Sequence, residues 1–171
     1  MRIVLIAKPG HADSGVGRYT VALAEALRQT GHQVLLVYPR APLPYALMRI
    51  VRRGLGWDLG AFFDNNPLWA AYPPADIYHL TSQNLASMLL IRRPPGRTVV
   101  TVHDIIPWLV RDNPELNVYH SQLHALFDRL ALWGLKRADH LIADSSYSAV
   151  SLAEAPDRPL PAVTTVNLGV L

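Results

Sequence analysis

The first 38 residues, MRIVLIAKPGHADSGVGRYTVALAEALRQTGHQVLLVY, decide the fold class, because two short apolar runs flank one long amphipathic stretch. The runs IVLIA (3–7) and VLLVY (34–38) carry no charge, which is typical of strands covered on both faces of a parallel sheet. Between them, apolar residues recur at helical spacing from Val16 to Leu27. The order of these segments predicts a strand–helix–strand unit.

The same alternation continues to the end of the sequence. Asp13 or Ser14 is placed to cap the first helix and Gly31 to end it, and a second long helix is expected from about Leu116 to Arg137. Further strands are expected at 77–80, 98–102, 140–143 and 163–166. The pattern predicts an α/β fold, namely a Rossmann-like, doubly wound, mainly parallel sheet with helices on both faces.

Composition limits the size and the class of the protein. The 171 residues, half of them apolar, suit one domain with a real core. The lack of cysteine excludes a disulfide framework, a thiolate zinc site and a cysteine nucleophile. Neither a signal peptide nor an eighteen-residue apolar span is recognisable, so we expect a cytoplasmic protein.

The positive charge is unevenly distributed. No carboxylate occurs from Ala26 to Trp57, and none between Ile77 and His103. The arginines of these two stretches are Arg28, Arg40, Arg49, Arg52 and Arg53, and Arg92, Arg93 and Arg97. Phosphate is a natural partner for such clusters. The segment 45–57 also contains both arginines and large apolar side chains. It could contact anionic lipid, or it could be an ordinary packed helix whose arginines are solvated.

The first strand–helix connection contains glycines at a helix start, Gly15-Val16-Gly17. Such glycines let backbone N–H groups approach an anion, or simply ease a turn. Thr20 takes the place of a third glycine, and the second strand ends Tyr38-Pro39-Arg40 without an acid for the ribose. A nicotinamide-dependent enzyme is therefore disfavoured.

Two polar motifs follow later strands. His103 and Asp104 come after the strand at 98–102, at the edge where open α/β sheets bind ligands. The histidine can donate to a phosphate or a sugar hydroxyl while the aspartate orients it, or the pair can cap the next segment. The serines that begin at Ser145 either cap a helix or face the cleft.

His120, His124 and Asp128 lie four residues apart on the second long helix, without a zinc signature. Such a row is typical of a solvated helix face, so no metal is expected.

Five short motifs follow one another along the chain: GVGRYT (15–20), GHQV (31–34), DIYH (76–79), VHDIIP (102–107) and ADHLIADS (138–145). Together they resemble the amino-terminal half of glycosyltransferase family 4. The resemblance implies a GT-B architecture of two Rossmann-like domains and transfer of a sugar from a nucleotide sugar with retention of configuration. It also implies that the amino-terminal domain mainly holds the acceptor and that no metal or other cofactor is needed.

The resemblance gives roles to individual residues. Gly15-Val16-Gly17 would face the donor diphosphate, although Ser14 stands where the family often has another glycine. His103 would face the transferred sugar, with Asp104 as its neighbour. The remaining expected cleft or acceptor residues are Arg18, Tyr19 and Ser145, and the expected acceptor or membrane face comprises Arg49, Arg52, Arg53 and Trp57.

These observations lead to a definite expectation. Residues 1–166 would form the acceptor-side domain of a hexosyltransferase, and 167–171 would start the crossover to a donor domain that this chain lacks, leaving it inactive alone. Its expected partners are a sugar or lipid-linked acceptor and the inner face of the membrane. The alternative is a free-standing, non-catalytic binding module. A nucleic-acid binder is not expected, because only arginine clusters favour it.

Overall fold

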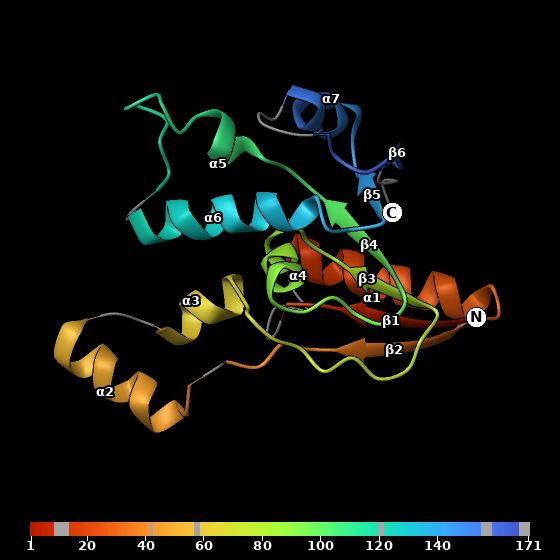
Figure 1. Ribbon diagram of the computed structural model, residues 1–171, viewed down its shortest axis with the longest axis horizontal. Helices are drawn as coiled ribbons and strands as arrows, with labels where there is room; N and C mark the ends of the chain where they lie inside the picture. The colour runs from red at the N-terminus through yellow and green to blue at the C-terminus, as the bar shows by residue number, and fades with distance from the viewer. Residues whose placement is uncertain (9–13, 42, 57–58, 120–121, 155–158, 168–171) are drawn as a thin grey trace.

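The structure is a computed structural model, and it describes the chain except residues 9–13, 42, 57–58, 120–121, 155–158 and 168–171 (Figure 1). Its centre is a parallel sheet of six strands in the order β2-β1-β3-β4-β5-β6. The strands are β1 (Arg2–Ile6), β2 (Gln33–Val37), β3 (Ile77–Leu80), β4 (Arg97–Val102), β5 (His140–Ala143) and β6 (Val163–Thr165). The helices are α1 (Gly15–Gln29), α2 (Tyr45–Leu55), α3 (Leu59–Asn65), the 3-10 helix η1 (Gln83–Ser87), α4 (Met88–Ile91), α5 (Ile106–Leu109), α6 (Gln122–Leu135) and α7 (Ser146–Glu154).

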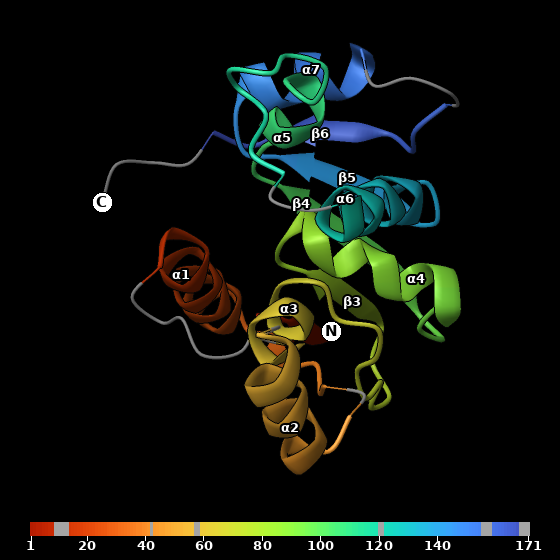
Figure 2. The ribbon, with the colours of Figure 1, turned by 90° about the vertical axis from the view of Figure 1, so that its left-hand side faces the viewer.

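The predicted fold class is confirmed. All six predicted strands are present, with bounds that differ by one residue at most, and all pair in parallel. Figure 2 shows α1 on one side of the sheet and α4 and α6 on the other. The predicted start of a crossover at 167–171 lies, apart from Asn167, outside the described residues.

Strand β1 explains why the sheet is covered on both faces. Ile3 and Leu5 pack with the apolar side of α1, whereas Val4 and Ile6 belong to the larger core beneath α4 and α6. All four side chains are buried. A strand buried on both faces needs an unbroken apolar run, because neither side of the pleat meets water.

Helix α1 begins and ends as predicted. The Ser14 hydroxyl accepts a hydrogen bond of 3.0 Å from the N–H of Gly17, which satisfies one of the donors that a helix start leaves unpaired. Gly31 follows the helix with φ of 83°, a left-handed conformation that glycine adopts without steric cost. The chain then turns directly into β2.

The second long helix is shorter than predicted. The expected helix from Leu116 to Arg137 is wrong at its start, since α6 begins at Gln122. Before it, the side-chain oxygen of Asn113 accepts from the N–H of Glu115, and that of Asn117 accepts from the N–H of Tyr119. Asparagine side chains that bond their own backbone in this way compete with helical hydrogen bonds.

The second arginine cluster also differs from its expected role. Asp139 lies 3.2 Å from the Arg93 guanidinium and 3.9 Å from that of Arg97, and it accepts from the N–H of Thr98. Because Arg97 is the first residue of β4, this cluster lies at the amino end of the strands. Arg93 and Arg97 therefore pair with the protein's own carboxylate, at the edge opposite the carboxyl ends of the sheet.

Helix α6 packs on η1 through Gly134. A Cβ built at Gly134 overlaps the carbonyl oxygen of Ala86, so the two backbones are closer than any side chain allows. Glycine is otherwise a poor residue for a helix interior. The close approach therefore explains why glycine occupies this position.

We expect Gly134→Ala to destabilise the protein by about 1 to 3 kcal/mol, because overpacking of a well-filled core costs that much. The matched control is Gly54→Ala in α2, where an added Cβ meets no atom within 4 Å. The control should leave stability unchanged or raise it by up to about 1 kcal/mol. Thermal unfolding of both variants measures the difference, and a Gly134→Ala protein as stable as the wild type would contradict the packing argument.

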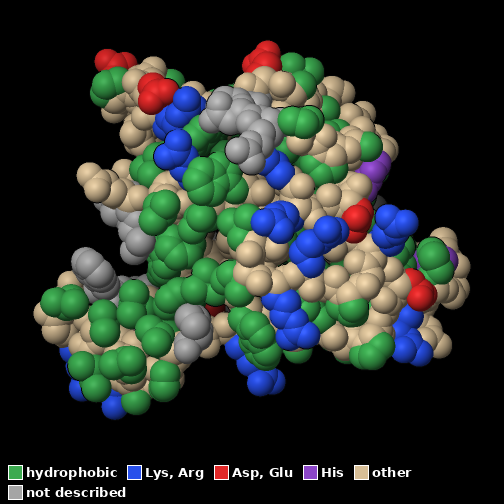
Figure 3. Space-filling model, viewed as in Figure 1, with side chains coloured by type: hydrophobic (Ala, Val, Ile, Leu, Met, Phe, Trp, Pro, Cys, Tyr) green, Lys and Arg blue, Asp and Glu red, His purple; other side chains and the backbone are tan. Residues whose placement is uncertain are grey.

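Helices α2 and α3 form an excursion between β2 and β3 that projects from one end of the sheet (Figure 1). No residue of α2 is buried. Its side chains Leu47, Ile50 and Leu55 are 43%, 65% and 66% exposed. The space-filling view shows a dense apolar area over this excursion (Figure 3). Among the described residues, no helix is long and apolar enough to cross a membrane.

Candidate active site

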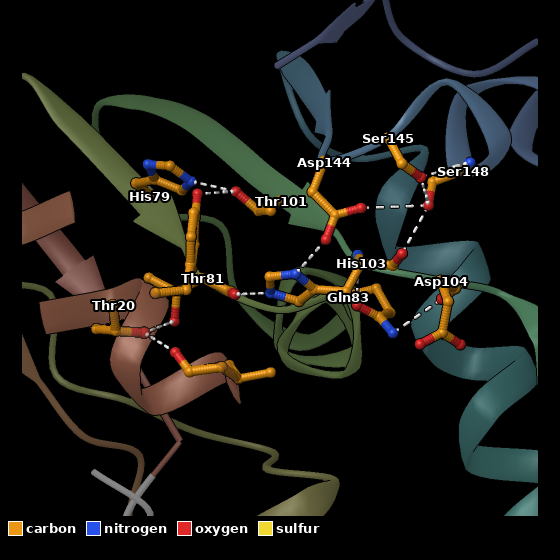
Figure 4. A network of polar contacts seen from close by, with 12 residues as sticks. Thr20, His79, Thr81, Gln83, Thr101, His103, Asp104, Asp144, Ser145 and Ser148 are labelled. Carbon is orange, nitrogen blue, oxygen red and sulfur yellow. Dashed lines mark hydrogen bonds and ion pairs between the residues drawn. The ribbon is translucent and has the colours of Figure 1, made fainter. Parts of the chain in front are cut away.

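The candidate site lies at the carboxyl ends of three neighbouring strands. Thr81 follows β3, His103 follows β4 and Asp144 follows β5. Because β4 pairs in parallel with both β3 and β5, the three residues meet at one edge of the sheet (Figure 4). Open α/β sheets bind their ligands at this edge.

The His103 ring is held on both sides. Its Nδ1 lies 2.8 Å from Oδ2 of Asp144, and its Nε2 lies 2.9 Å from the carbonyl oxygen of Thr81. The His103 N–H donates to Oε1 of Gln83 at 3.2 Å, and Nε2 of Gln83 donates to the Asp104 carbonyl at 2.9 Å. Both the ring and the backbone that carries it are therefore fixed by neighbouring elements.

Asp104 does not contact the ring of its neighbour. Its Oδ1 accepts from the N–H of Ile106 at 3.3 Å, next to the start of α5. The negative charge of Asp104 also acts on Lys8, which follows β1: burial lowers the pKa of Lys8, and Asp104 partly offsets that effect. The structure thus gives the orienting contact to Asp144, whereas the sequence had pointed to Asp104.

A second polar chain lies behind the ring. The Thr101 hydroxyl bonds Nε2 of His79 at 2.7 Å and the hydroxyl of Tyr19 at 2.8 Å. The Tyr19 ring meets His103 edge-on, with centroids 5.1 Å apart. Burial, with a smaller effect from nearby His103, lowers the pKa of His79 to about 4, so this histidine is neutral at physiological pH. Burial also raises the pKa of Tyr19.

The start of α1 offers backbone donors near this network. The Gly17 N–H is taken by the Ser14 cap, whereas the N–H groups of Gly15 and Val16 have no hydrogen-bond partner among the described residues. Gly15 is exposed, and a Cβ there would meet nothing within 4 Å. The predicted glycine motif therefore leaves two N–H groups for an anion at a helix start.

The other predicted cleft residues have different surroundings. Arg18 is exposed in the first turn of α1. The Tyr19 hydroxyl turns inward to Thr101. Ser145 accepts from the N–H of Ser148 at 3.1 Å and so caps the start of α7, which confirms the capping interpretation. The Ser148 hydroxyl in turn donates to the His103 carbonyl at 2.6 Å.

The predicted acceptor or membrane face lies apart from this network. Arg49, Arg52 and Arg53 are exposed on α2, and Trp57 lies outside the described residues. The site residues that sequence reasoning missed are Thr81, Gln83, Thr101, His79 and the ring contact of Asp144. Thr81 and Asp144 had a recognisable signal, since each is the first polar residue after a predicted strand.

A cavity of about 560 Å³ opens between α5, the segment after it and α6. Trp108, Tyr119, Arg111 and Arg129 are among its lining residues, and the Arg111 guanidinium lies 4.0 Å from the centre of the Trp108 ring. Tyr119 donates to Asp128, and burial with a contribution from the nearby charge of Asp104 raises the pKa of that carboxyl.

The contact with Tyr119 corrects the expectation for the row of residues on α6. Asp128 is half-buried and not part of a solvated face, whereas His124 is exposed and His120 lies outside the described residues. Where side chains are described, no group of three histidine or acidic residues is arranged to hold a metal ion.

Comparisons with known proteins show the family from the sequence and the fold from solved structures. Residues 14–170 match the sequence model of Glycosyltransferase Family 4. A sucrose-phosphate synthase structure from Thermosynechococcus elongatus superimposes with a TM-score of 0.57 at 13% identity, covering 99% of this chain and 90% of that one. No curated protein matched the sequence.

Two longer glycosyltransferases give weaker superpositions. One is a transferase from Siraitia grosvenorii in complex with UDP, with a TM-score of 0.49, 12% identity and coverage of 97% of this chain and 47% of that one. The other is an alpha-glucosyltransferase in complex with UDP, with a TM-score of 0.49, 18% identity and coverage of 96% and 43%. This chain therefore spans less than half the length of either protein.

Proposed function

This chain belongs to Glycosyltransferase Family 4, and from that premise we propose that it is the acceptor-side domain of a retaining glycosyltransferase. The enzyme would move a hexosyl group from a nucleotide sugar to a hydroxyl of an acceptor. A second Rossmann-like domain would bind most of the nucleotide sugar. The reaction would not need a metal ion bound by residues of this domain.

The observation that carries this proposal is that His103 lies next to the start of α1. The Tyr19 ring edge rests on His103, and the Thr20 hydroxyl lies 3.0 Å from that of Thr81. These contacts fix the first turns of α1 beside the carboxyl ends of β3 and β4. The N–H groups of Gly15 and Val16, which have no partner among the described residues, are fixed with them. A helix start of this kind attracts anions, because its N–H groups and the helix dipole both favour negative charge.

In the proposed reaction, the bond between the sugar carbon and the donor diphosphate breaks, and negative charge builds up on the departing oxygen. A bond forms between the same carbon and the acceptor hydroxyl oxygen, and the hydroxyl proton passes to the departing phosphate. The N–H groups of Gly15 and Val16 would stabilise that charge from one side, and His103 would do so from the side of the sheet. Fixed donors and charges act strongly in such a site, because they need no reorganisation as the charge develops.

We propose that the acceptor occupies the cavity between α5 and α6. Its Trp108, Tyr119 and arginine side chains offer the aromatic faces and donors that suit a sugar. The helices that line the cavity lie near the site, because α5 follows His103 and Asp104 directly and the charge of Asp104 acts on Asp128 of α6. An acceptor hydroxyl would reach the transferred sugar from there.

We also propose that α2 rests on an anionic membrane surface. Leu47, Ile50 and Leu55 give α2 an exposed apolar face, and Arg49, Arg52 and Arg53 lie on the opposite side of the helix. The stretch from Ala26 to Trp57 contains no carboxylate to oppose such contact. Helices of this composition lie in the interface, with arginines at the lipid headgroups. This location suits a lipid-linked acceptor.

The experiment that tests the proposed function compares this chain alone with the complete enzyme. We expect the chain alone to unfold in one cooperative thermal transition yet to transfer no sugar, because the donor-binding residues would lie in the other domain. The complete polypeptide should release a nucleoside diphosphate from one of a panel of nucleotide sugars. Turnover by this chain alone would contradict the half-enzyme proposal, and inactivity of the complete polypeptide would favour a binding module.

A further inference from the structure

The two hydrogen bonds of the His103 ring determine its protonation state. Nδ1 faces Oδ2 of Asp144 at 2.8 Å, and Nε2 faces the Thr81 carbonyl oxygen at 2.9 Å (Figure 4). Both partners are acceptors, since a carboxylate and a backbone carbonyl carry no hydrogen to donate. The side chains of His103 and Asp144 are only 14% and 12% exposed, so water does not readily replace either partner.

A neutral imidazole carries a single N–H. A neutral His103 ring would therefore donate only one of these two hydrogen bonds. Its other nitrogen would place a lone pair within hydrogen-bond distance of an acceptor oxygen, which is unfavourable. Only the doubly protonated ring donates to both oxygens. We propose that Asp144 holds His103 as an imidazolium, so that the carboxyl end of β4 carries a fixed positive charge at neutral pH.

Among the described titratable groups around the His103 ring, Asp144 is the group whose negative charge contacts the ring. His79, from β3, is neutral because burial lowers its pKa to about 4, and Tyr19, from α1, stays neutral because burial raises its pKa. The carboxylate of Asp104, next along the chain, is bonded to the N–H of Ile106. Asp144 is therefore the one carboxylate that touches the ring within the described part of the chain.

The start of α7 supports the charged form of Asp144. Asp144 directly precedes Ser145, the residue that caps α7, and negative charge is stabilised near a helix start. Asp144 is thus a positioning residue, which fixes both the orientation and the charge of His103.

This charge has a consequence for the transfer reaction that rests on the proposed function. With both nitrogens bonded to the protein, His103 would act on the departing nucleoside diphosphate through its positive charge and not as a proton donor. The ring would keep its proton throughout the reaction, because Asp144 and the Thr81 carbonyl stabilise the cation before and after the bond breaks.

The direct test is nitrogen-15 NMR of the histidine side chains in the whole chain, recorded as a function of pH. At pH 7 we expect both ring nitrogens of His103 to give the resonances of protonated nitrogens. Asp144→Asn should leave the ring with one unprotonated nitrogen at pH 7, because the opposite charge in contact that favours the charged ring is then absent. Asp104→Asn is the matched control, since it removes a nearby carboxylate that does not touch the ring, and the ring should stay doubly protonated in it.

A wild-type ring with one unprotonated nitrogen at pH 7 would overturn the proposal, as would the same protonation of the ring in the two variants. The wild-type spectrum decides the question even if Asp144→Asn fails to fold. In the complete enzyme, Asp144→Asn should move the alkaline limit of kcat/KM to lower pH, because the ring then loses its proton earlier. If NMR shows the expected loss of the ring proton while the pH profile stays unchanged, the charge of His103 has no part in transfer, and that portion of the proposed function fails separately.

Discussion

Replacement of His103 by alanine is expected to lower kcat/KM of the complete enzyme by about a hundredfold or more, since loss of one preorganised group that stabilises transition-state charge typically costs this much. The ring is fixed between Asp144 and the Thr81 carbonyl, so its charge needs no reorientation during the reaction. Steady-state kinetics with saturating acceptor measures the effect.

The control for this prediction is His32→Ala. His32 lies in the turn before β2, at the amino end of the strands, so its replacement changes a histidine far from the site. We expect the control to keep wild-type activity. A His103→Ala enzyme within about threefold of the wild type, a difference of less than 1 kcal/mol, would show that His103 is only a structural residue.

The triple variant Arg49→Gln, Arg52→Gln and Arg53→Gln is expected to bind anionic vesicles about a hundredfold more weakly than the wild type. Each arginine near a charged bilayer contributes about 1 kcal/mol, and all three are exposed on one helix. Salt should weaken the binding of the wild type, because exposed charges are screened beyond about 8 Å at physiological ionic strength. Co-sedimentation with vesicles of anionic and of neutral lipid measures both effects.

The matched control carries the same change of charge elsewhere on the surface. Arg28, Arg92 and Arg137 are exposed and lie outside α2, so replacing these three by glutamine should weaken vesicle binding much less. Equal and weak binding by the wild type and the α2 variant would remove the membrane proposal. A soluble acceptor would then be favoured, with solvated arginines on α2.

The strands of the sheet were readable from local sequence as short apolar runs, and their bounds were correct to within one residue. The run at 3–7 is unbroken because β1 is buried on both faces. The expectation that the run at 34–38 is covered on both faces was wrong, because β2 lies at the edge of the sheet and its Leu35 is 49% exposed. The start of α6 was less readable. Asn113 and Asn117 end the helical pattern through their own side-chain hydrogen bonds, and apolar spacing does not report such bonds.

For the site, the sequence by itself determined that His103 follows a buried strand and that glycines begin the first helix. It did not determine what touches the ring. Thr81 and Asp144 are 22 and 41 residues away along the chain, and they reach His103 only because β4 lies between β3 and β5 in the sheet. Strand order is a property of the whole packed sheet, so contacts between strand ends, including both contacts of the His103 ring, were decided by the tertiary structure alone.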